Sequence, residues 1–526
     1  MKKIFLLVLL LSIFCQVSAQ QLSLKGNVAA NRVIVGASVT LAELKTSSFT
    51  DSLGNFYFLN LKPAVYHLKI SAVGFKTITY KLDLKTDTVL AQMELAALTE
   101  NLNEVVVTGT QKEVKRMESS VPVEIYSANF FRKNPTPNIF DALQNVNGVR
   151  PQLNCNICNT GDIHINGLEG PYTMVLIDGM PIVSSLSTVY GLSGIPNSMV
   201  ERIEIVKGPA SSLYGSEAVG GLINVITKKA QNAPLFFADF MATDYREYNT
   251  DIGFKFNLSP KISVLTGINY FNYQNEVDRN NDGFTDVTLQ DRISVFQKFN
   301  FSRKQNRLFS IASRFLYEDR WGGDMHWNKS FRGGEVIYGE SIYTNRFEII
   351  GNYQLPIKEK MMLAFSVTNH QQDSRYGSTS YIAQQKIAFS QLTLDKKIGK
   401  NDLLFGAALR YTYYDDNTPA TAANTIIDPL NRPQRIFLPG LFVQDEIKLS
   451  KAHSFLAGIR LDYNSEHGKI FTPRMAYKWS LNENHIFRLN AGTGFRVVNI
   501  FTEDHAALTG AREVVMNNDL KPERSY

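Results

Sequence analysis

The sequence predicts a mostly-β protein, in which a small β-sandwich and an α+β unit precede a transmembrane antiparallel β-barrel. From Ala233 onward, segments of roughly ten to fourteen residues alternate in polarity, which is typical of transmembrane strands. Short connectors alternate with long polar ones, as the two ends of an outer-membrane barrel require. After Gln20 no run approaches the ~18 apolar residues of a membrane helix, so a membrane-spanning fold here must be built from closed strands.

The N-terminus has the organisation of a secretory signal peptide over residues 1–19. Lys2 and Lys3 precede the apolar run Ile4–Phe14, and Val17-Ser18-Ala19 provides a small-residue cleavage site. Cys15 suggests a lipoprotein, but the bulky residue before it does not fit a lipidation site. We therefore expect an exported protein.

The amino-acid composition limits the classes of protein to which this chain could belong. The 526-residue chain has a net charge of +6, partly from the signal peptide, and no basic run, which disfavours a nucleic-acid partner. Aromatic residues make up 11% of the chain and would suit the aromatic girdles of a barrel. Removal of the signal leaves Cys155 and Cys158, too few cysteines for disulfides to hold the fold together.

Residues 20–99 are predicted to form the small β-sandwich. Short alternating segments are separated by turn-forming residues at the spacing of such a fold. These segments are Ser38–Leu44, Phe56–Leu61, Tyr66–Ser71 and Phe75–Leu84.

Residues 231–526 are predicted to contribute about thirteen or fourteen barrel strands. The clearest are Asp251–Leu258, Ile262–Tyr273, Arg292–Phe301, Leu308–Tyr317, Tyr343–Tyr353, Met362–Asn369, Leu403–Tyr413, Phe437–Ile447, Phe455–Tyr463 and Ile486–Phe495. The long connectors Asn275–Gln290, Arg320–Glu340 and Asp415–Arg435 should face outside.

Between these parts lies the most informative run of the chain, residues 174–229. The strand-like segments Met174–Ile177 and Arg202–Val206 end at Asp178-Gly179 and Gly208-Pro209, and the run closes on Leu222–Ile226. Its IDG, ERIEIVKGP and GGLINVITKK blocks resemble the plug of TonB-dependent outer-membrane receptors.

That resemblance assigns residues 111–230 to a plug domain inside the barrel. A helical pattern is predicted over Ser127–Gly148. The family's barrel has about 22 strands, so the resemblance implies a C-terminally truncated receptor here, with Leu520–Tyr526 as the entry to a further strand. The segment TDSLGNFYFLNLKPAVYHLKISAVGF resembles the carboxypeptidase regulatory-like domain that precedes many of these receptors, and this name implies no peptidase activity.

Residues 100–110 contain a segment that resembles a TonB box. A short β-branched segment flanked by polar residues can add as a strand to the sheet edge of a partner. The alternative is an ordinary first strand of the plug. The predicted box residues are Glu104, Val105, Val106, Val107 and Thr108.

The first long connector contains a candidate calcium loop. Its oxygen-bearing residues have the spacing of a calcium loop, and Gly283 permits the sharp turn. Leu289 stands where an EF-hand has a bidentate glutamate, so a solvated acidic loop is the alternative. The predicted metal residues are Asp278, Asn280, Asp282, Phe284 (through its carbonyl) and Asp286.

Cysteine and histidine residues supply two further candidate sites. Cys155 and Cys158 have a CxxC spacing that serves a disulfide or a metal contact in the plug. His505 lies between segments that partly resemble the boxes flanking the haem-binding histidine of haem receptors, and His164 would be a second, plug-side ligand. Two polar loop histidines are the alternative.

The resemblance implies TonB-dependent import of a scarce ligand, a metal chelate such as a siderophore, haem or cobalamin. The partners implied are a periplasmic energy-coupling protein of the TonB type, outer-membrane lipid and the chelate itself, with no cofactor required beyond possible calcium. A surface adhesin or assembly protein and a hydrolase are the alternatives. The box-like segment argues against the first, and the lack of Ser-His-Asp, HExxH or P-loop spacings argues against an enzyme.

Overall fold

The computed structural model describes residues 21–30, 33–72, 75, 77–96, 105–155, 160–181, 192, 194–423, 430–482, 485–497 and 520–526. The predicted signal peptide, Glu104, Cys158 and His505 lie outside these residues. The chain divides into two compact units, Met1–Glu104 and Val105–Tyr526, and each is described by itself.

The first unit is a small β-sandwich. One sheet has the order β4-β1-β7, with β8 also paired to β1, and the other has the order β3-β2-β5-β6. Alternate residues of the strands, such as Phe56, Phe58 and Leu68, face a common buried core. The strands are β1 (Leu22–Ala29), β2 (Ser38–Leu41), β3 (Thr46–Phe49), β4 (Asn55–Leu61), β5 (Ala64–Ser71), β6 (Ile78–Leu84), β7 (Thr88–Val89) and β8 (Met93–Glu94).

The second unit begins with an α+β subdomain, the predicted plug. Its five-stranded sheet has the order β11-β16-β17-β14-β15, and β9-β10 and β12-β13 are separate hairpins. The elements are β9 (Val105–Val106), β10 (Val114–Lys115), β11 (Glu124–Ser127), α2 (Ala128–Lys133), α3 (Ile139–Ala142), β12 (Val149–Cys155), β13 (Thr160–Ile165), β14 (Thr173–Ile177), β15 (Met180–Pro181), β16 (Val200–Lys207), α5 (Ser211–Tyr214) and β17 (Gly221–Thr227).

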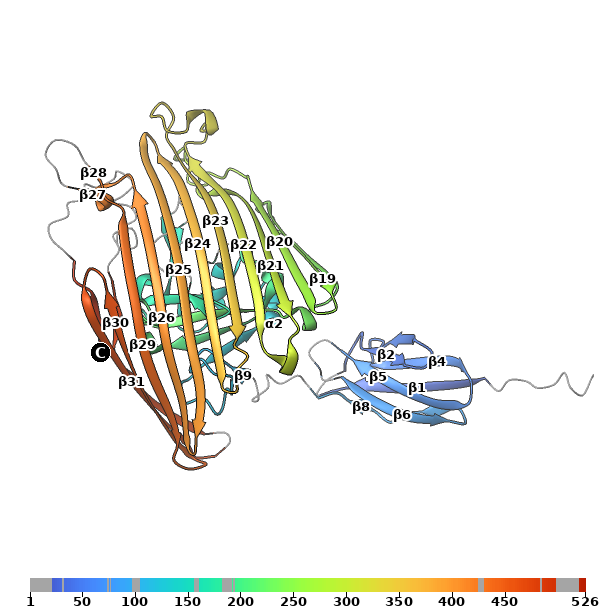
Figure 1. Ribbon diagram of the computed structural model, residues 1–526. Helices are drawn as coiled ribbons and strands as arrows, with labels where there is room; N and C mark the ends of the chain where they lie inside the picture. Colours follow the sequence, from blue (N-terminus) through green and yellow to red (C-terminus); the bar gives the residue numbers. More distant parts are fainter. Residues whose placement is uncertain are drawn as a thin grey trace, which may run out of the picture. The chain divides into compact units, whose positions relative to one another are not determined.

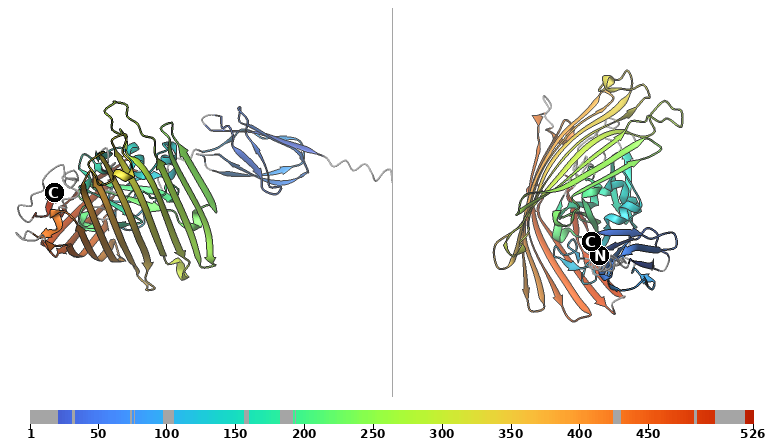
Figure 2. Two further views of the ribbon diagram at one scale, coloured as in Figure 1. Left: turned by 90° about the horizontal axis from the view of Figure 1, so that it is seen from above. Right: turned by 90° about the vertical axis from the view of Figure 1, so that its right-hand side faces the viewer.

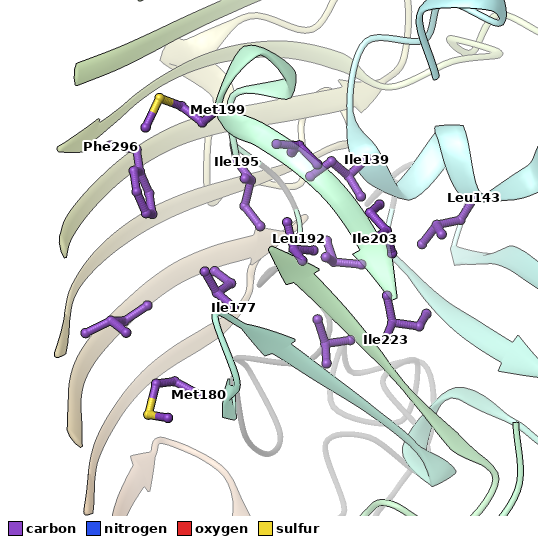
Figure 3. Close-up of a cluster of buried hydrophobic side chains, with 14 of the residues drawn as sticks. Ile139, Leu143, Ile177, Met180, Leu192, Ile195, Met199, Ile203, Ile223 and Phe296 are labelled. Carbon is purple, nitrogen blue, oxygen red and sulfur yellow. The ribbon is translucent and has the colours of Figure 1, made fainter. Parts of the chain in front are cut away.

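The prediction of one continuous helix over Ser127–Gly148 is wrong, because the segment is interrupted. The structure has α2, then a break, then α3 and a short 3-10 turn at Leu143–Asn145. Pro135 and Pro137 lie in the break, and proline disfavours the helical conformation of the residue before it. The apolar positions are nevertheless buried as the pattern predicts, since Ile139 and Leu143 belong to the plug core (Figure 3).

Thirteen strands then form one antiparallel sheet that curves around the plug. Figures 1 and 2 show the plug elements on the concave side of this wall. Each strand pairs with its sequence neighbours, except that β26 pairs with β29 across a long connection; among the described residues the end strands β18 and β32 do not pair with each other. The strands are β18 (Phe236–Ala242), β19 (Glu247–Ser259), β20 (Ile262–Tyr273), β21 (Leu289–Phe301), β22 (Phe309–Gly323), β23 (Gly339–Gln354), β24 (Lys360–Tyr376), β25 (Thr379–Ile398), β26 (Asn401–Asp416), β29 (Gln434–Lys448), β30 (His453–Asn464), β31 (Gly468–Ser480) and β32 (Ile486–Gly492). Two further antiparallel pairs are β27 (Ala422–Ala423) with β28 (Leu430–Asn431) and β33 (Gly494–Arg496) with β34 (Glu523–Ser525).

The two faces of the wall differ in chemistry. On β30, the outward residues Ile459 and Leu461 are exposed apolar side chains, whereas the inward residues Arg460 and Asp462 are buried and paired with each other. Apolar-out and polar-in alternation is the pattern of a strand between lipid and a polar interior. Among the described residues, no helix combines the length and apolar character needed to cross a membrane.

The strands are uneven in length. β20 has 12 residues, whereas β25 has 20. Along β24 and β25, the outward side chains change from the apolar Val367 and Leu392 to the polar Gln371 and Lys386 toward the end that carries the longer loops. The long strands therefore continue beyond the apolar band. The predicted antiparallel barrel wall with about thirteen strands is confirmed.

Candidate functional site

The predicted box segment is folded against the plug. Val105 and Val106 form β9 and pair antiparallel with Lys115 and Val114 of β10. The side chain of Val106 is fully buried in an apolar cluster that includes plug residues and barrel-wall residues such as Leu404. The segment is thus docked against the plug, and its assignment as a TonB box stays a prediction.

A buried carboxylate holds the segment. Glu204, at the middle of β16, has no exposed surface. Its Oε2 accepts hydrogen bonds from the Val107 and Thr108 amides, each at 3.0 Å, and from Thr108 Oγ1 at 2.5 Å. Its Oε1 accepts from Arg202 Nε at 2.9 Å. One oxygen therefore serves the segment, and the other is neutralised by an arginine of the same strand.

Two further side chains complete the contacts of Thr108. Asn224 lies directly opposite Glu204 in the β16–β17 ladder, and its Nδ2 donates to Thr108 Oγ1 at 2.9 Å. The Tyr214 hydroxyl of α5 donates to the Thr108 carbonyl at 2.9 Å. Burial, together with the nearby Glu204 carboxylate, raises the pKa of Tyr214 well above its ordinary value, so this hydroxyl remains a donor at physiological pH.

The residues that follow the segment are fastened to the barrel wall. Lys112 forms ion pairs with Asp395 and Asp402 at the β25–β26 turn. Lys478 Nζ donates to the Glu118 carbonyl at 2.6 Å, and Arg488 Nε donates to the Ser119 carbonyl at 3.0 Å. Ser120 Oγ donates to Glu446 at 2.6 Å. All these wall residues lie near the short turns, the end predicted to face the periplasm.

Other charged contacts join the plug to the wall. Lys298 Nζ of β21 lies 2.8 Å from Asp178 Oδ2 and 2.7 Å from Thr227 Oγ1 of the plug. Arg410 of β26 forms an ion pair with Glu217 at 3.0 Å. Arg460 of β30 also donates to the Leu213 carbonyl. The plug is therefore held by polar contacts as well as by the apolar core shown in Figure 3, in which Phe296 of the wall lies beside Met199.

The inner wall carries a cluster of buried arginines. Arg314 and Arg346 both pair with Glu348, and Arg292 and Arg320 both pair with Glu318. Four guanidinium groups thus share two carboxylates on β21, β22 and β23. Asp141 and Asp251 are further acidic neighbours of Arg292, and Arg292, Arg314 and Arg346 are buried. The cluster is therefore a buried network of opposite charges inside the wall.

The structure describes only two of the four histidine and cysteine residues that were predicted as site residues. His164 of β13 is largely buried, with its Nε2 3.0 Å from Asp162 Oδ1. Cys155 ends β12 and pairs with Thr160 of β13. His505 and Cys158 lie outside the described residues, so the haem and disulfide assignments stay predictions.

The predicted calcium loop is a compact turn. Asp278 accepts from the amides of Asp282 and Gly283, Asp282 accepts from the Phe284 amide, and Asp286 accepts from the Arg279 amide. Gly283 has φ +84°, as the sharp turn requires. Within the described part of the chain, no three His, Cys, Asp or Glu side chains form a group that could hold a metal. The carboxylates instead accept hydrogen bonds from amides of the loop, and calcium binding stays a prediction.

Glu204 and Asn224 were not predicted as site residues. Each is a polar residue at the centre of an apolar strand, in IEIV and LINVI respectively. A polar side chain in such a position requires a buried hydrogen-bond partner, and this is a signal that the sequence does contain. The partner itself is not apparent, because Glu204 and Thr108 are 96 residues apart.

Comparison with known protein families matches three successive parts of the chain. Residues 24–107 match a CarboxypepD_reg-like domain, residues 115–222 match a TonB-dependent receptor plug domain, and residues 214–526 match a TonB-dependent receptor-like β-barrel. The last match alone covers more than half of the chain.

Individual relatives agree with these matches. An iron-regulated outer membrane virulence protein of Vibrio cholerae is 25% identical over 454 residues, which cover 82% of this chain and 65% of the relative. The siderophore receptor PirA of Acinetobacter baumannii has a TM-score of 0.59 at 16% identity, over 74% of this chain and 63% of its own. A ferric enterobactin receptor mutant of Pseudomonas aeruginosa has a TM-score of 0.58 at 17% identity, over 72% of this chain and 63% of its own. The chain thus spans somewhat less than two thirds of the length of these proteins.

Proposed function

Since the chain belongs to the TonB-dependent receptor family, we propose that it actively imports a scarce ligand across the outer membrane. Its family and the outer-membrane relative confirm the predicted location in the outer membrane of a Gram-negative bacterium. The matched family is one of receptors and transporters, so the prediction of a protein that is not an enzyme is also confirmed.

The docked coupling segment is the observation that carries this proposal. Val105–Thr108 begins with the short strand β9 (Val105–Val106) at the N-terminal border of the plug, where a periplasmic TonB-type protein would pair with it by strand addition. The plug is joined to the wall by Lys112, Lys298 and Arg410, so a ligand does not pass by simple diffusion. Mechanical work that the partner applies through the segment would rearrange the plug and open a path for the ligand.

For the ligand we propose a ferric siderophore. The names of the related proteins refer to iron regulation, siderophores and ferric enterobactin. Haem and cobalamin are the alternatives, and haem would use His505 and His164.

Uptake measurements test the proposal. Cells that produce the complete receptor should accumulate radiolabelled ferric siderophore, and a protonophore should stop accumulation while surface binding persists. Growth of a deletion strain on ferric siderophore, haem or cobalamin as single sources separates the three ligands. Accumulation that persists after collapse of the proton gradient would exclude energy-coupled import, and a surface adhesin would show no accumulation at all.

The calcium loop is proposed as a secondary feature of the outer surface. A bound ion would take over the carboxylate oxygens of Asp278, Asp282 and Asp286 that now accept loop amides. Calcium should then slow proteolysis of the loop in the native receptor, and Asp282→Asn should remove this effect. Equal rates of cleavage in calcium and in a chelator would contradict calcium binding by this loop.

A further inference from the structure

We propose that Glu204, Asn224 and Tyr214 form a latch for the coupling segment, and that this latch opens while a separate anchor, residues 112–120, keeps the plug attached to the barrel wall. The proposal rests on the proposed function, because it concerns how the segment becomes available to a periplasmic partner. It assigns a positioning role to residues that lie in the plug sheet and not in the segment itself.

The latch is specific for the polar atoms of Thr108. The amide and hydroxyl of Thr108 donate to Glu204, the hydroxyl accepts from Asn224, and the carbonyl accepts from Tyr214. Every hydrogen-bonding atom of this residue therefore meets a latch side chain. Thr108 is 1% exposed and Glu204 is 0% exposed, so water does not replace these bonds while the segment stays docked.

The anchor uses different partners. The latch residues all belong to the plug, on β16, β17 and α5. The anchor residues are held by wall side chains, including Asp395, Glu446 and Arg488. The two fastenings therefore join the chain to two different bodies.

Their order along the chain decides how a pulling force is distributed. A force applied at Val105 acts first on the contacts of Val105–Thr108, which are the pairing of β9 with β10, the apolar contacts of Val106 and the latch. Once Thr108 is free, further tension passes through Gly109 into the anchor and from there into the wall. Gly109 itself is tied to the wall, since its carbonyl accepts from Arg474 at 3.3 Å. Opening of the latch, together with separation of β9 from β10, therefore exposes the segment without drawing out the plug sheet.

Thiol labelling at two positions tests this division. Val106→Cys reports on the docked segment, and Ser119→Cys reports on the anchor; both parent side chains are fully buried. The full-length receptor in detergent is treated with a maleimide, without ligand or coupling protein, and the parent without a reporter corrects for Cys155 and Cys158. Glu204→Gln should raise the labelling rate at the Val106→Cys reporter by about tenfold and leave the Ser119→Cys reporter unchanged.

Matched variants separate the latch from a general loss of structure. Glu201→Gln, on the same strand, should change neither reporter, because Glu201 has no contact with Thr108 among the described residues. Thr108→Val should act like Glu204→Gln, whereas Thr108→Ser keeps the hydroxyl and should restore the parent rate. Arg488→Gln should raise labelling only at the Ser119→Cys reporter.

Two results would overturn the proposal. One is an unchanged rate at the Val106→Cys reporter in both Glu204→Gln and Thr108→Val. The other is a joint rise at both reporters in these variants, which would show that segment and anchor open as one body. Neither readout involves import, so a wrong ligand or a non-transporting receptor would not affect it, and a failed latch would leave the proposed import standing.

Discussion

Replacement of Lys298 by methionine should loosen the plug from the barrel wall by a measurable amount. Lys298 Nζ lies 2.8 Å from Asp178 Oδ2, and their side chains are only 8% and 14% exposed. Removal of one partner of a buried ion pair costs about 3–5 kcal/mol. Asp178 would still accept from the amide and hydroxyl of Thr227, which places the expected cost near the lower limit, at about 3 kcal/mol.

Hydrogen exchange at the Thr227 amide measures this cost, because that amide donates to Asp178 at 2.8 Å. A loss of about 3 kcal/mol corresponds to a fall in protection of about 100-fold. The exposed Lys261→Met is the matched control and should leave protection unchanged. Asp178→Asn combined with Lys298→Met should lose little more than Lys298→Met alone, since the unpaired charge is then absent. A fall below about threefold, or an equal fall in the control, would refute this reasoning.

Three other predictions concern coupling, redox state and ligand. Val106→Pro should abolish uptake and leave surface capture of the ligand intact, because proline removes the amide that strand addition requires; normal uptake would remove the box assignment. Cys155 and Cys158 should form a disulfide in the exported protein, since the compartment is oxidising, and two free thiols by mass spectrometry after non-reducing isolation would favour a metal role instead. If haem is carried, His505→Ala and His164→Ala should each lower haem-dependent growth strongly, and unchanged growth of the double variant would exclude a histidine haem clamp.

Much of the barrel wall can be predicted from the local alternation of polar and apolar residues. The strand predicted at Ile262–Tyr273 has the bounds of β20, because alternation along it is regular and Pro260 precedes it. β25 was not among the clearest predicted strands. It carries Gln384, Gln385 and Lys386 in succession, so its upper half lacks alternation. This half of β25 is a strand because it pairs with β24 and β26. Such pairing cannot be predicted from the residues of one segment alone.

The site was harder to predict than the wall. The sequence placed a short β-branched segment at Glu104–Thr108, and Val105–Val106 is indeed a strand. It did not indicate that the segment is docked, because the contacts come from residues near positions 204, 214 and 224. Such long-range hydrogen bonds depend on the register of the plug sheet, which local periodicity does not determine.

The unequal strand lengths have a consequence for the surface of the cell. At about 3.3 Å per residue and a tilt of about 40°, β25 rises about 50 Å, whereas β20 rises about 30 Å. The wall is therefore uneven in height, and its longest strand exceeds the roughly 30 Å hydrocarbon layer by about 20 Å, which is shared between its two ends. Antibodies and other large molecules outside the cell would reach the ladder around Gln371 and Lys386 before they reach the shorter strands. Substitutions on the upper parts of β24 and β25 should therefore change what binds the cell surface without touching lipid, plug or coupling segment.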